Sequence, residues 1–144
     1  MRAGHGGWGI LLGLACVAAG TAMAGGNPLD TSRGRHRVLV VSAPDADDAG
    51  LKAQRAALGP VRGGLAERDL VVVEAVGGTP EARAVRAGLG LPAGAFRAVL
   101  IGKDGGAKLV AEAPIPPQKL FATIDAMPMR RDEMRRRPSP GGGE

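Results

Sequence analysis

The sequence predicts an α/β domain of three layers, in which a four-stranded mixed sheet is packed between helices. Apolar runs without alternation, typical of strands covered on both faces, occur at residues 37–42 and 70–76. A helix-forming segment separates these runs, which implies a right-handed parallel crossover. Two further runs, at residues 96–102 and 107–112, flank Asp104-Gly105, a dipeptide typical of tight hairpins. The predicted order of elements is therefore β-α-β-α-β-β-α.

The first strand and the first helix are joined by an acidic turn. Pro44 ends the strand, and Asp45-Ala46-Asp47-Asp48 opens a helix whose first turn is acidic, as the helix dipole prefers. We expect Asp45 or Asp47 to cap this helix. Because Pro60 cannot donate a backbone hydrogen bond, we expect a kink or two abutting helices near Gly59-Pro60. The apolar face of this region, repeating at about every 3.5 residues, consists of Leu51, Leu58, Val61 and Leu65.

Two more helices are predicted in the second half of the chain. Thr79-Pro80 has the sequence of a helix start, with threonine as the cap and proline at the first helical position, and Gly90 should end that helix. A last helix should begin near Pro117. Pro128 interrupts it, and we expect helix again over residues 129–137. The apolar face of the last helix consists of Leu120, Phe121, Ile124 and Met127.

The first 24 residues are typical of a secretory signal peptide. Arg2 precedes an apolar run over residues 8–19, and Ala22-Met23-Ala24 supplies the small residues of a cleavage site after Ala24. The run is shorter than the roughly 20 residues that a membrane-spanning helix needs. We therefore expect an exported protein from which residues 1–24 are removed. The two alternatives are a retained membrane-spanning helix and a lipoprotein anchored through Cys16.

Removal of residues 1–24 leaves 144 minus 24, or 120, residues, enough for one domain. We predict a polar lead-in of turn residues over 25–35 and a single domain over 36–129. A basic helical end with a disordered tail should follow over 130–144, the tail comprising residues 138–144.

The residue content excludes several functions. After residue 24 there is no cysteine, so neither a disulfide nor thiol catalysis is available, and His36 alone cannot complete a metal site. The acidic turn at residues 45–50 resembles the start of a calcium loop, but Ala56 stands where a bidentate glutamate is required. With two phenylalanines and no tyrosine, the chain lacks the row of aromatic rings on which bases stack. We predict no cofactor, no metal, no catalytic residue and no nucleic-acid partner.

The formal net charge of +5 is concentrated at the C-terminal end. Five arginines against two acids give residues 130–137 a charge of +3. A solvated helix end is the interpretation that we favour, and contact with anionic lipid or an acidic partner is the alternative. The charged residues are Arg130, Arg131, Asp132, Glu133, Arg135, Arg136 and Arg137.

The predicted order of elements is the layout of the thioredoxin-like fold. That fold implies the sheet order second, first, third, fourth strand, with the last strand antiparallel at an edge. Residues 37–48, 65–76, 96–108 and 120–134 resemble the bacterial domain of unknown function (DUF) 4174 family, notably in Ala-Glu-Arg-Asp-Leu-Val-Val-Val-Glu and Ile-Asp-Ala-Met-Pro-Met-Arg-Arg. The resemblance covers nearly all of the chain after residue 24. It implies similarity to peroxiredoxin-like domains, export to the bacterial periplasm and no established activity.

The resemblance also suggests where a site would lie. In peroxiredoxins the reactive cysteine follows the first strand, and an arginine at the head of a later strand holds its thiolate. Here Arg97 resembles that arginine, and the cysteine region corresponds to Ser42 through Asp48, which contains no sulfur. We therefore predict a polar crevice that binds an exported protein or a small ligand, at the carboxyl ends of the parallel strands. Its residues are Ser42, Asp45, Asp47, Asp48 and Arg97.

Two other interpretations of this crevice stay open. In one, an aspartate caps the helix and Arg97 simply pairs with it. In the other, the chain is a degenerate peroxiredoxin-related enzyme that uses Arg97 and a carboxylate for non-thiol chemistry. Lys103 and Asp104 are interpreted as turn residues of the hairpin.

Overall fold

The computed structural model describes residues 27–137. The predicted signal peptide, with Cys16, and the predicted disordered tail lie outside the described residues. No helix among residues 27–137 is long and apolar enough to cross a membrane.

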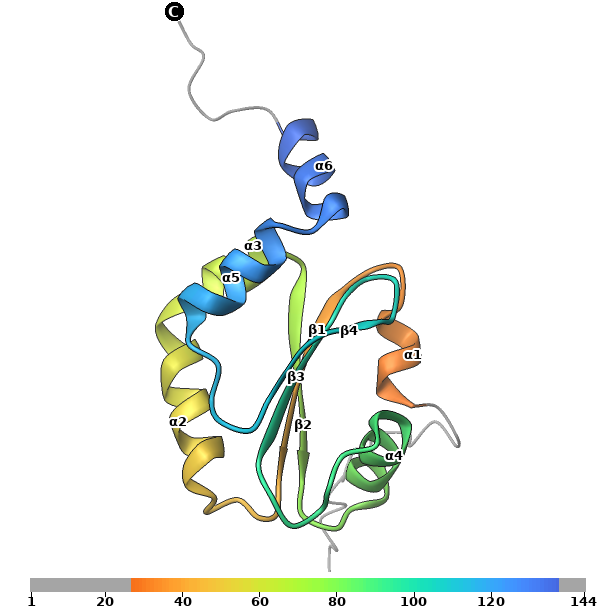
Figure 1. The fold of residues 1–144 in the computed structure, drawn as a ribbon, viewed down its shortest axis with the longest axis vertical. Coiled ribbons are helices and arrows are strands. Elements are labelled where there is room, and N and C mark those ends of the chain that lie inside the picture. Colours follow the sequence, from red (N-terminus) through yellow and green to blue (C-terminus); the bar gives the residue numbers. More distant parts are fainter. Residues whose placement is uncertain (1–26, 138–144) are drawn as a thin grey trace, which may run out of the picture.

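A four-stranded sheet lies between two layers of helices (Figure 1). The strands are β1 (Arg37–Ala43), β2 (Leu70–Val76), β3 (Arg97–Ile101) and β4 (Ala107–Ala111). Their order in the sheet is β2-β1-β3-β4. The mixed α/β fold and the strand order are those that the sequence predicts.

The strand directions determine which ends of the strands meet. β1 is parallel to β2, whereas β3 is antiparallel to both of its neighbours, β1 and β4. The last strand thus pairs antiparallel with its neighbour, as expected. Because β3 runs against β1, the head of β3 lies beside the carboxyl end of β1, and Arg97 is the register partner of Ser42.

Helices cover both faces of this sheet. In Figure 1, α2, α3 and α5 lie on one side, α1 and α4 lie on the other, and α6 extends beyond one end of the sheet. Their bounds are α1 Pro28–Ser32, α2 Ala49–Leu58, a 3₁₀ turn at Gly59–Val61, α3 Arg62–Glu67, α4 Pro80–Leu89, α5 Pro117–Asp125 and α6 Pro128–Arg136.

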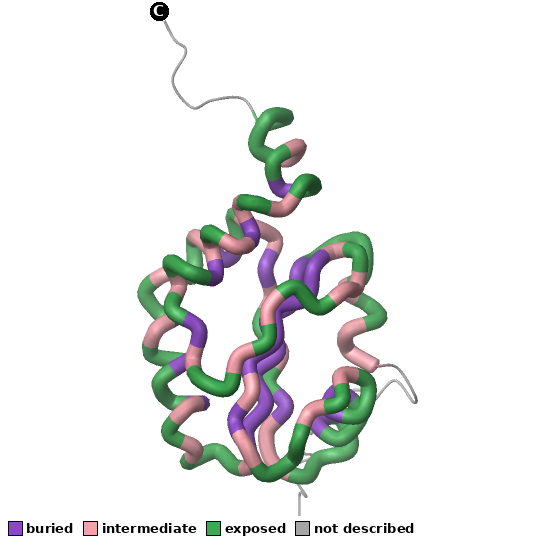
Figure 2. The backbone as a smooth tube through the Cα atoms, in the orientation of Figure 1, coloured by how far each residue is buried: buried purple, intermediate pink, exposed green. Residues whose placement is uncertain are grey.

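Alternation along the central strands divides the core between the two faces. In β1, Leu39 and Val41 pack with the apolar residues of α2 and α5, whereas Val38 and Val40 pack with those of α4. The buried residues concentrate on β1 and β3, as the purple segments in Figure 2 show. Even positions of β1 therefore face α4, and odd positions face α2 and α5.

Several local predictions are confirmed. The helix that Pro60 was expected to disturb is divided into α2, a 3₁₀ turn and α3. Thr79 caps α4 by accepting a hydrogen bond from the Ala82 N–H. Pro128 occupies the first turn of α6, where its missing N–H costs nothing. Gly105 has φ +85° in the hairpin turn, a conformation that favours glycine.

Two local predictions are wrong. Residues 28–32, expected to be turn material, form α1, because the Asn27 side chain accepts from the Leu29 N–H and Pro28 fits the first helical turn. The cap of α2 is neither Asp45 nor Asp47. A turn at residues 45–48 delays the helix until Ala49, so Asp48 caps it by accepting from the Leu51 N–H at 3.0 Å.

Candidate functional site

The predicted crevice is only partly assembled in the structure. Ser42 and Arg97 are neighbours in the sheet, but the Arg97 guanidinium donates to the Phe96 carbonyl and lies 3.5 Å from Glu112 Oε1. Positions 42 and 97 both fall on the face that packs against α4. The predicted aspartates precede α2, which covers the opposite face.

The side chains of the three aspartates have local partners, in their own turn or at the start of α2. Asp45 Oδ1 accepts from the Asp47 N–H at 2.8 Å, and the Asp48 side chain caps α2. The Asp47 carboxylate lies 3.8 Å from the Lys52 ammonium, and both side chains are exposed. None of these groups contacts Arg97 among the described residues, so the side chains named by the resemblance do not converge.

Arg86 of α4 occupies the place where a ligand was expected. Its guanidinium is buried and donates from Nε to Ser42 Oγ at 2.9 Å. It also donates from Nη2 to the carbonyl oxygens of Ala43 and Ala75 and from Nη1 to that of Gly77. The carboxyl ends of β1 and β2 are therefore filled by this side chain. Sequence reasoning missed Arg86, although its spacing from Ala82 and Val85 places it on the buried face of α4.

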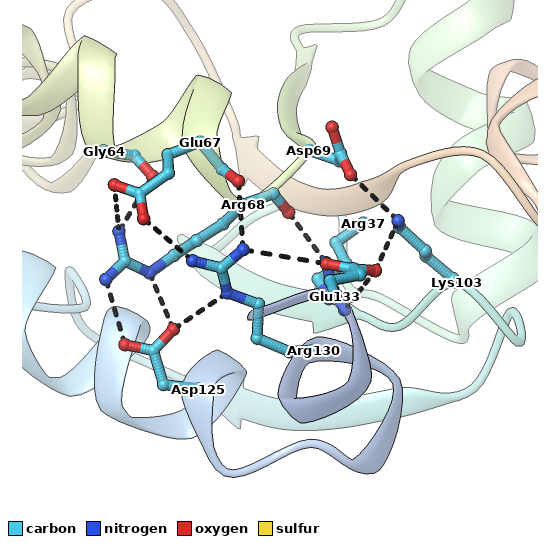
Figure 3. Close-up of polar contacts among 9 residues, drawn as sticks. All are labelled: Arg37, Gly64, Glu67, Arg68, Asp69, Lys103, Asp125, Arg130 and Glu133. Atoms are coloured by element: carbon cyan, nitrogen blue, oxygen red, sulfur yellow. Dashed lines mark hydrogen bonds and ion pairs between the residues drawn. The ribbon is translucent and has the colours of Figure 1, made fainter. Parts of the chain in front are cut away.

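A larger polar cluster lies at the opposite end of β1, where α6 docks (Figure 3). We call it the α6 clasp. Four cations and four carboxylates alternate within it, and they come from the start of β1, the turn between α3 and β2, the hairpin turn and three helices. Its members are Arg37, Arg68, Lys103 and Arg130 with Glu67, Asp69, Asp125 and Glu133.

Glu133 of α6 is the carboxylate that joins α6 to the sheet. It accepts two hydrogen bonds of 3.2 Å from the guanidinium of Arg37, which is 1% exposed, and one of 2.6 Å from Lys103 Nζ. Lys103 also donates to Asp69 at 2.9 Å. Lys103 is thus a turn residue whose side chain is 11% exposed and whose ammonium holds two segments together.

Arg130 is the second anchor of α6. Its side chain is 1% exposed and donates to Asp125 Oδ1 at 3.2 Å, to Glu67 Oε1 at 3.0 Å and to the Glu67 carbonyl at 3.1 Å. Asp125 also accepts two hydrogen bonds from Arg68, whose guanidinium lies 4.1 Å from the centre of the Phe121 ring. The expectation of a solvated basic end is therefore wrong for Arg130 and Glu133, because α6 docks through them.

The clasp lowers the pKa of two carboxyl groups, those of Glu133 and Asp125. Burial by itself raises the pKa of the Glu133 carboxyl, but the hydrogen bonds and charges of Arg37 and Lys103 outweigh burial and hold this pKa below its ordinary value. Asp125 behaves in the same way. Burial raises its pKa, and the hydrogen bonds from Arg68 and Arg130 lower it by more.

These shifts predict a loss of stability in acid. A carboxyl whose folded pKa is depressed contributes its full stabilisation above its unfolded pKa, about 4.3 for glutamate and about 3.9 for aspartate, and loses it as pH falls through the folded value. We expect the free energy of unfolding to fall steadily as pH drops below about 4.5, measured by urea unfolding at a series of pH values. Glu133→Gln should show a shallower slope. Equal slopes for the two proteins would contradict the role given to Glu133.

A recess lies between the hairpin turn and the junction of α5 with α6. It has a volume of about 300 Å³. Its apolar wall includes Ala126, Met127, Pro128 and Met129, and the Met129 side chain is 48% exposed. We call it the α6 recess. Its lining is completed by Arg37, Gly102, Lys103, Asp104, Lys108 and Thr123.

The clasp and the recess share residues. Arg37 and Lys103 belong to both, and each is fixed by Glu133. Lys108 is held by Asp104 at 2.7 Å across the hairpin turn, and the hydrogen bond from Lys108 lowers the pKa of Asp104. The recess is thus a preformed apolar hollow whose floor and hairpin side are held by ion pairs.

A comparison with known families decides the affiliation of the chain. The model of the family "Domain of unknown function (DUF4174)" matches residues 28–133. The chain belongs to the DUF4174 family. The matched region of this DUF4174 chain includes both clasp anchors of α6, Arg130 and Glu133, together with Met127 and Met129 of the recess.

A longer relative also matches this DUF4174 chain. This relative is the Sushi repeat-containing protein SRPX of Rattus norvegicus, to which the chain is 32% identical over 120 residues. The alignment covers 74% of this chain and 26% of SRPX. The chain therefore spans about a quarter of the length of this relative.

Proposed function

We propose that the protein is an exported, non-catalytic binding module, and that its ligand site is the α6 recess. The observation that carries this proposal is a concave apolar surface of about 300 Å³ beside the exposed Met129 side chain, next to a set of ion pairs that fix its floor. Ligand sites in proteins are concave and mostly apolar, with few polar groups. Methionine side chains suit such a site because they adapt to the shape of a ligand.

The predicted crevice gives weaker support to a ligand-binding site or to an enzyme active site. A non-thiol enzyme would need Arg97 and a carboxylate of residues 45–48 to face the same reacting group. Arg97 instead lies beside Glu112, and Arg86 takes the space at the carboxyl ends of β1 and β2. The alignment with about a quarter of SRPX is in keeping with a domain that can be joined to other sequence.

An apolar side chain is the group that the recess would take. Burying a leucine side chain is worth about 1.5–3 kcal/mol, and the cost of association offsets part of this for a short peptide. We therefore expect weak binding of a neutral peptide with one leucine, such as acetyl-Gly-Ser-Gly-Leu-Gly-Ser-Gly-amide. With ¹³C-methyl-methionine protein, the NMR signals of Met127 and Met129 should shift on titration.

A variant that fills the recess tests this site. Ala126 is exposed and lines the recess, so Ala126→Trp should occupy it without disturbing the core. The variant should weaken peptide binding at least tenfold, measured by the same methyl titration. Ala84→Trp places the same side chain on an exposed position of α4 and should leave binding unchanged. Equal binding by both variants would exclude the recess as the ligand site.

A further inference from the structure

The outer surface of α6 has an excess of positive charge. Arg131, Arg136 and Arg137 are exposed, and none of them has a carboxylate partner among residues 27–137. The partly exposed acid Asp132 is paired with Arg135. The inner side of α6 is used by Arg130 and Glu133 in the clasp. A partner that approaches α6 from outside therefore meets unpaired guanidinium groups.

One of these arginines is aligned with the recess. Arg136 follows Met129 by seven residues, and seven steps of about 100° return to within about 20° of the same direction. The rise of about 1.5 Å per residue places Arg136 about 10 Å from Met129 along the helix. Arg131 is two residues from Met129 and points to the other side of α6. Arg136 thus stands on the recess side of the helix, two turns further on.

We propose that the α6 recess binds an extended acidic peptide segment, in which an apolar side chain enters the recess and a carboxylate three residues away pairs with Arg136. An extended chain advances about 3.3 Å per residue, so three residues span the same distance of about 10 Å. This inference rests on the proposed function, because it assumes that the recess is the ligand site. It adds the charge and the spacing of the partner.

A lipid surface fits α6 less well. A helix that lies in a membrane interface needs an apolar face along its length. The exposed large hydrophobic side chains of α6 are Met129 and Met134, which are five residues apart and point about 140° away from each other. The recess is concave, and a concave hollow accommodates a single side chain better than the flat surface of a bilayer. The favoured partner is therefore a peptide.

Three peptides of equal length separate spacing from charge. The first is the neutral leucine peptide. The second is acetyl-Glu-Ser-Gly-Leu-Gly-Ser-Glu-amide, with a glutamate three residues from the leucine on each side, so that either chain direction is served. The third, acetyl-Gly-Ser-Glu-Leu-Glu-Ser-Gly-amide, has the same composition with its glutamates next to the leucine. Affinities are measured by the methyl titration of Met127 and Met129 at low salt.

We expect the second peptide to bind about threefold to fivefold more tightly than the other two, since exposed ion pairs are individually weak. The gain should disappear in 0.5 M NaCl and in Arg136→Gln. Arg131→Gln removes an equal charge from the same helix and should keep the gain. Both arginines are exposed and outside the clasp, so the variants should fold, which their amide spectra will show.

Each contrary result has a distinct meaning. Equal gains in affinity for the two acidic peptides would show that charge alone matters, and would contradict the proposed spacing of three residues between the apolar side chain and the carboxylate. If the neutral peptide binds and the glutamates add nothing, this inference fails and the proposed function stands. If no peptide shifts the Met127 and Met129 signals, both fail. If the protein binds phosphatidylserine vesicles through Arg136 and binds no peptide, the partner of this surface of α6 is a membrane, and the proposal of a peptide partner is wrong.

Discussion

Replacing Glu133 with alanine is expected to lower the free energy of unfolding by about 3–5 kcal/mol, because the substitution leaves a buried charge without its partner. The Arg37 side chain is 1% exposed, and Glu133 is the carboxylate that its guanidinium contacts. In this variant Lys103 would retain one of its two carboxylate partners, Asp69. Urea unfolding at neutral pH gives the free energy directly.

A neighbouring pair on the same helix provides the control for Glu133→Ala. Asp132 pairs with Arg135 at the surface, where both side chains are exposed, so Asp132→Ala should change the free energy of unfolding by less than about 0.5 kcal/mol. Adding Arg37→Met to Glu133→Ala should recover part of the loss, because no unpaired guanidinium then stays buried. If Glu133→Ala lowers the free energy of unfolding no more than Asp132→Ala does, the stabilising role given to the clasp is wrong.

Replacing Arg86 with alanine is expected to lower the free energy of unfolding by about 2–4 kcal/mol. The substitution removes the donor to Ser42 Oγ and to the carbonyl oxygens of Ala43 and Ala75, and leaves a cavity between α4 and the sheet. Arg86→Lys should give an intermediate loss, since an ammonium cannot reach all of these acceptors from one position. Urea unfolding measures both variants.

An exposed arginine on the same helix is the control for Arg86→Ala. Arg83→Ala should change the free energy of unfolding by less than about 0.5 kcal/mol. In Arg86→Ala the backbone amide signals at the carboxyl ends of β1 and β2 should also shift. A fully stable Arg86→Ala protein would mean that water or a ligand replaces the guanidinium there, and the predicted crevice would again be the better site.

Much of the fold could be predicted because its signals are local. Continuous apolar runs indicated β1 and β2, Asp104-Gly105 indicated the hairpin, and Thr79-Pro80 indicated the start of α4. The start of α2 was less predictable, since three aspartates in four residues offered several caps. Only the turn at residues 45–48 decides that Asp48 is the cap.

The clasp could not be predicted, because its contacts join distant parts of the sequence. Glu133 is 96 residues from Arg37 and 30 from Lys103. Seen locally, Glu133 is one of two acids among five arginines, a composition that suggests a solvated helix end. Its burial follows only once α6 is placed against the start of β1 and the hairpin turn.

The predicted crevice shows how far a resemblance extends. The resemblance suggested that Arg97 and Ser42 line one crevice, and the sheet register makes these two residues neighbours. It did not place the side chains, because alternation sends positions 42 and 97 to the face of α4, away from the aspartates that precede α2. An argument from face alternation in the strands could have separated these groups before the structure was known.

The clasp also accounts for the position of α6 beside the recess. α6 buries only Arg130, so its docking depends on the charged groups of Arg130 and Glu133 more than on apolar packing. Buried ion pairs with several hydrogen bonds fix geometry well even where their net stabilisation is modest. The recess is therefore a preorganised surface, and preorganisation reduces the entropy cost of binding.

The most direct test of the α6 recess as the ligand site is a map of backbone amide shifts on addition of the leucine peptide, because one spectrum compares the two candidate sites. We expect shifts at residues 102–108 and 126–129, around the α6 recess, and unchanged signals at residues 42–48 and at Arg97. Shifts confined to residues 42–48 and Arg97 would contradict this expectation and return the ligand site to the carboxyl ends of the parallel strands.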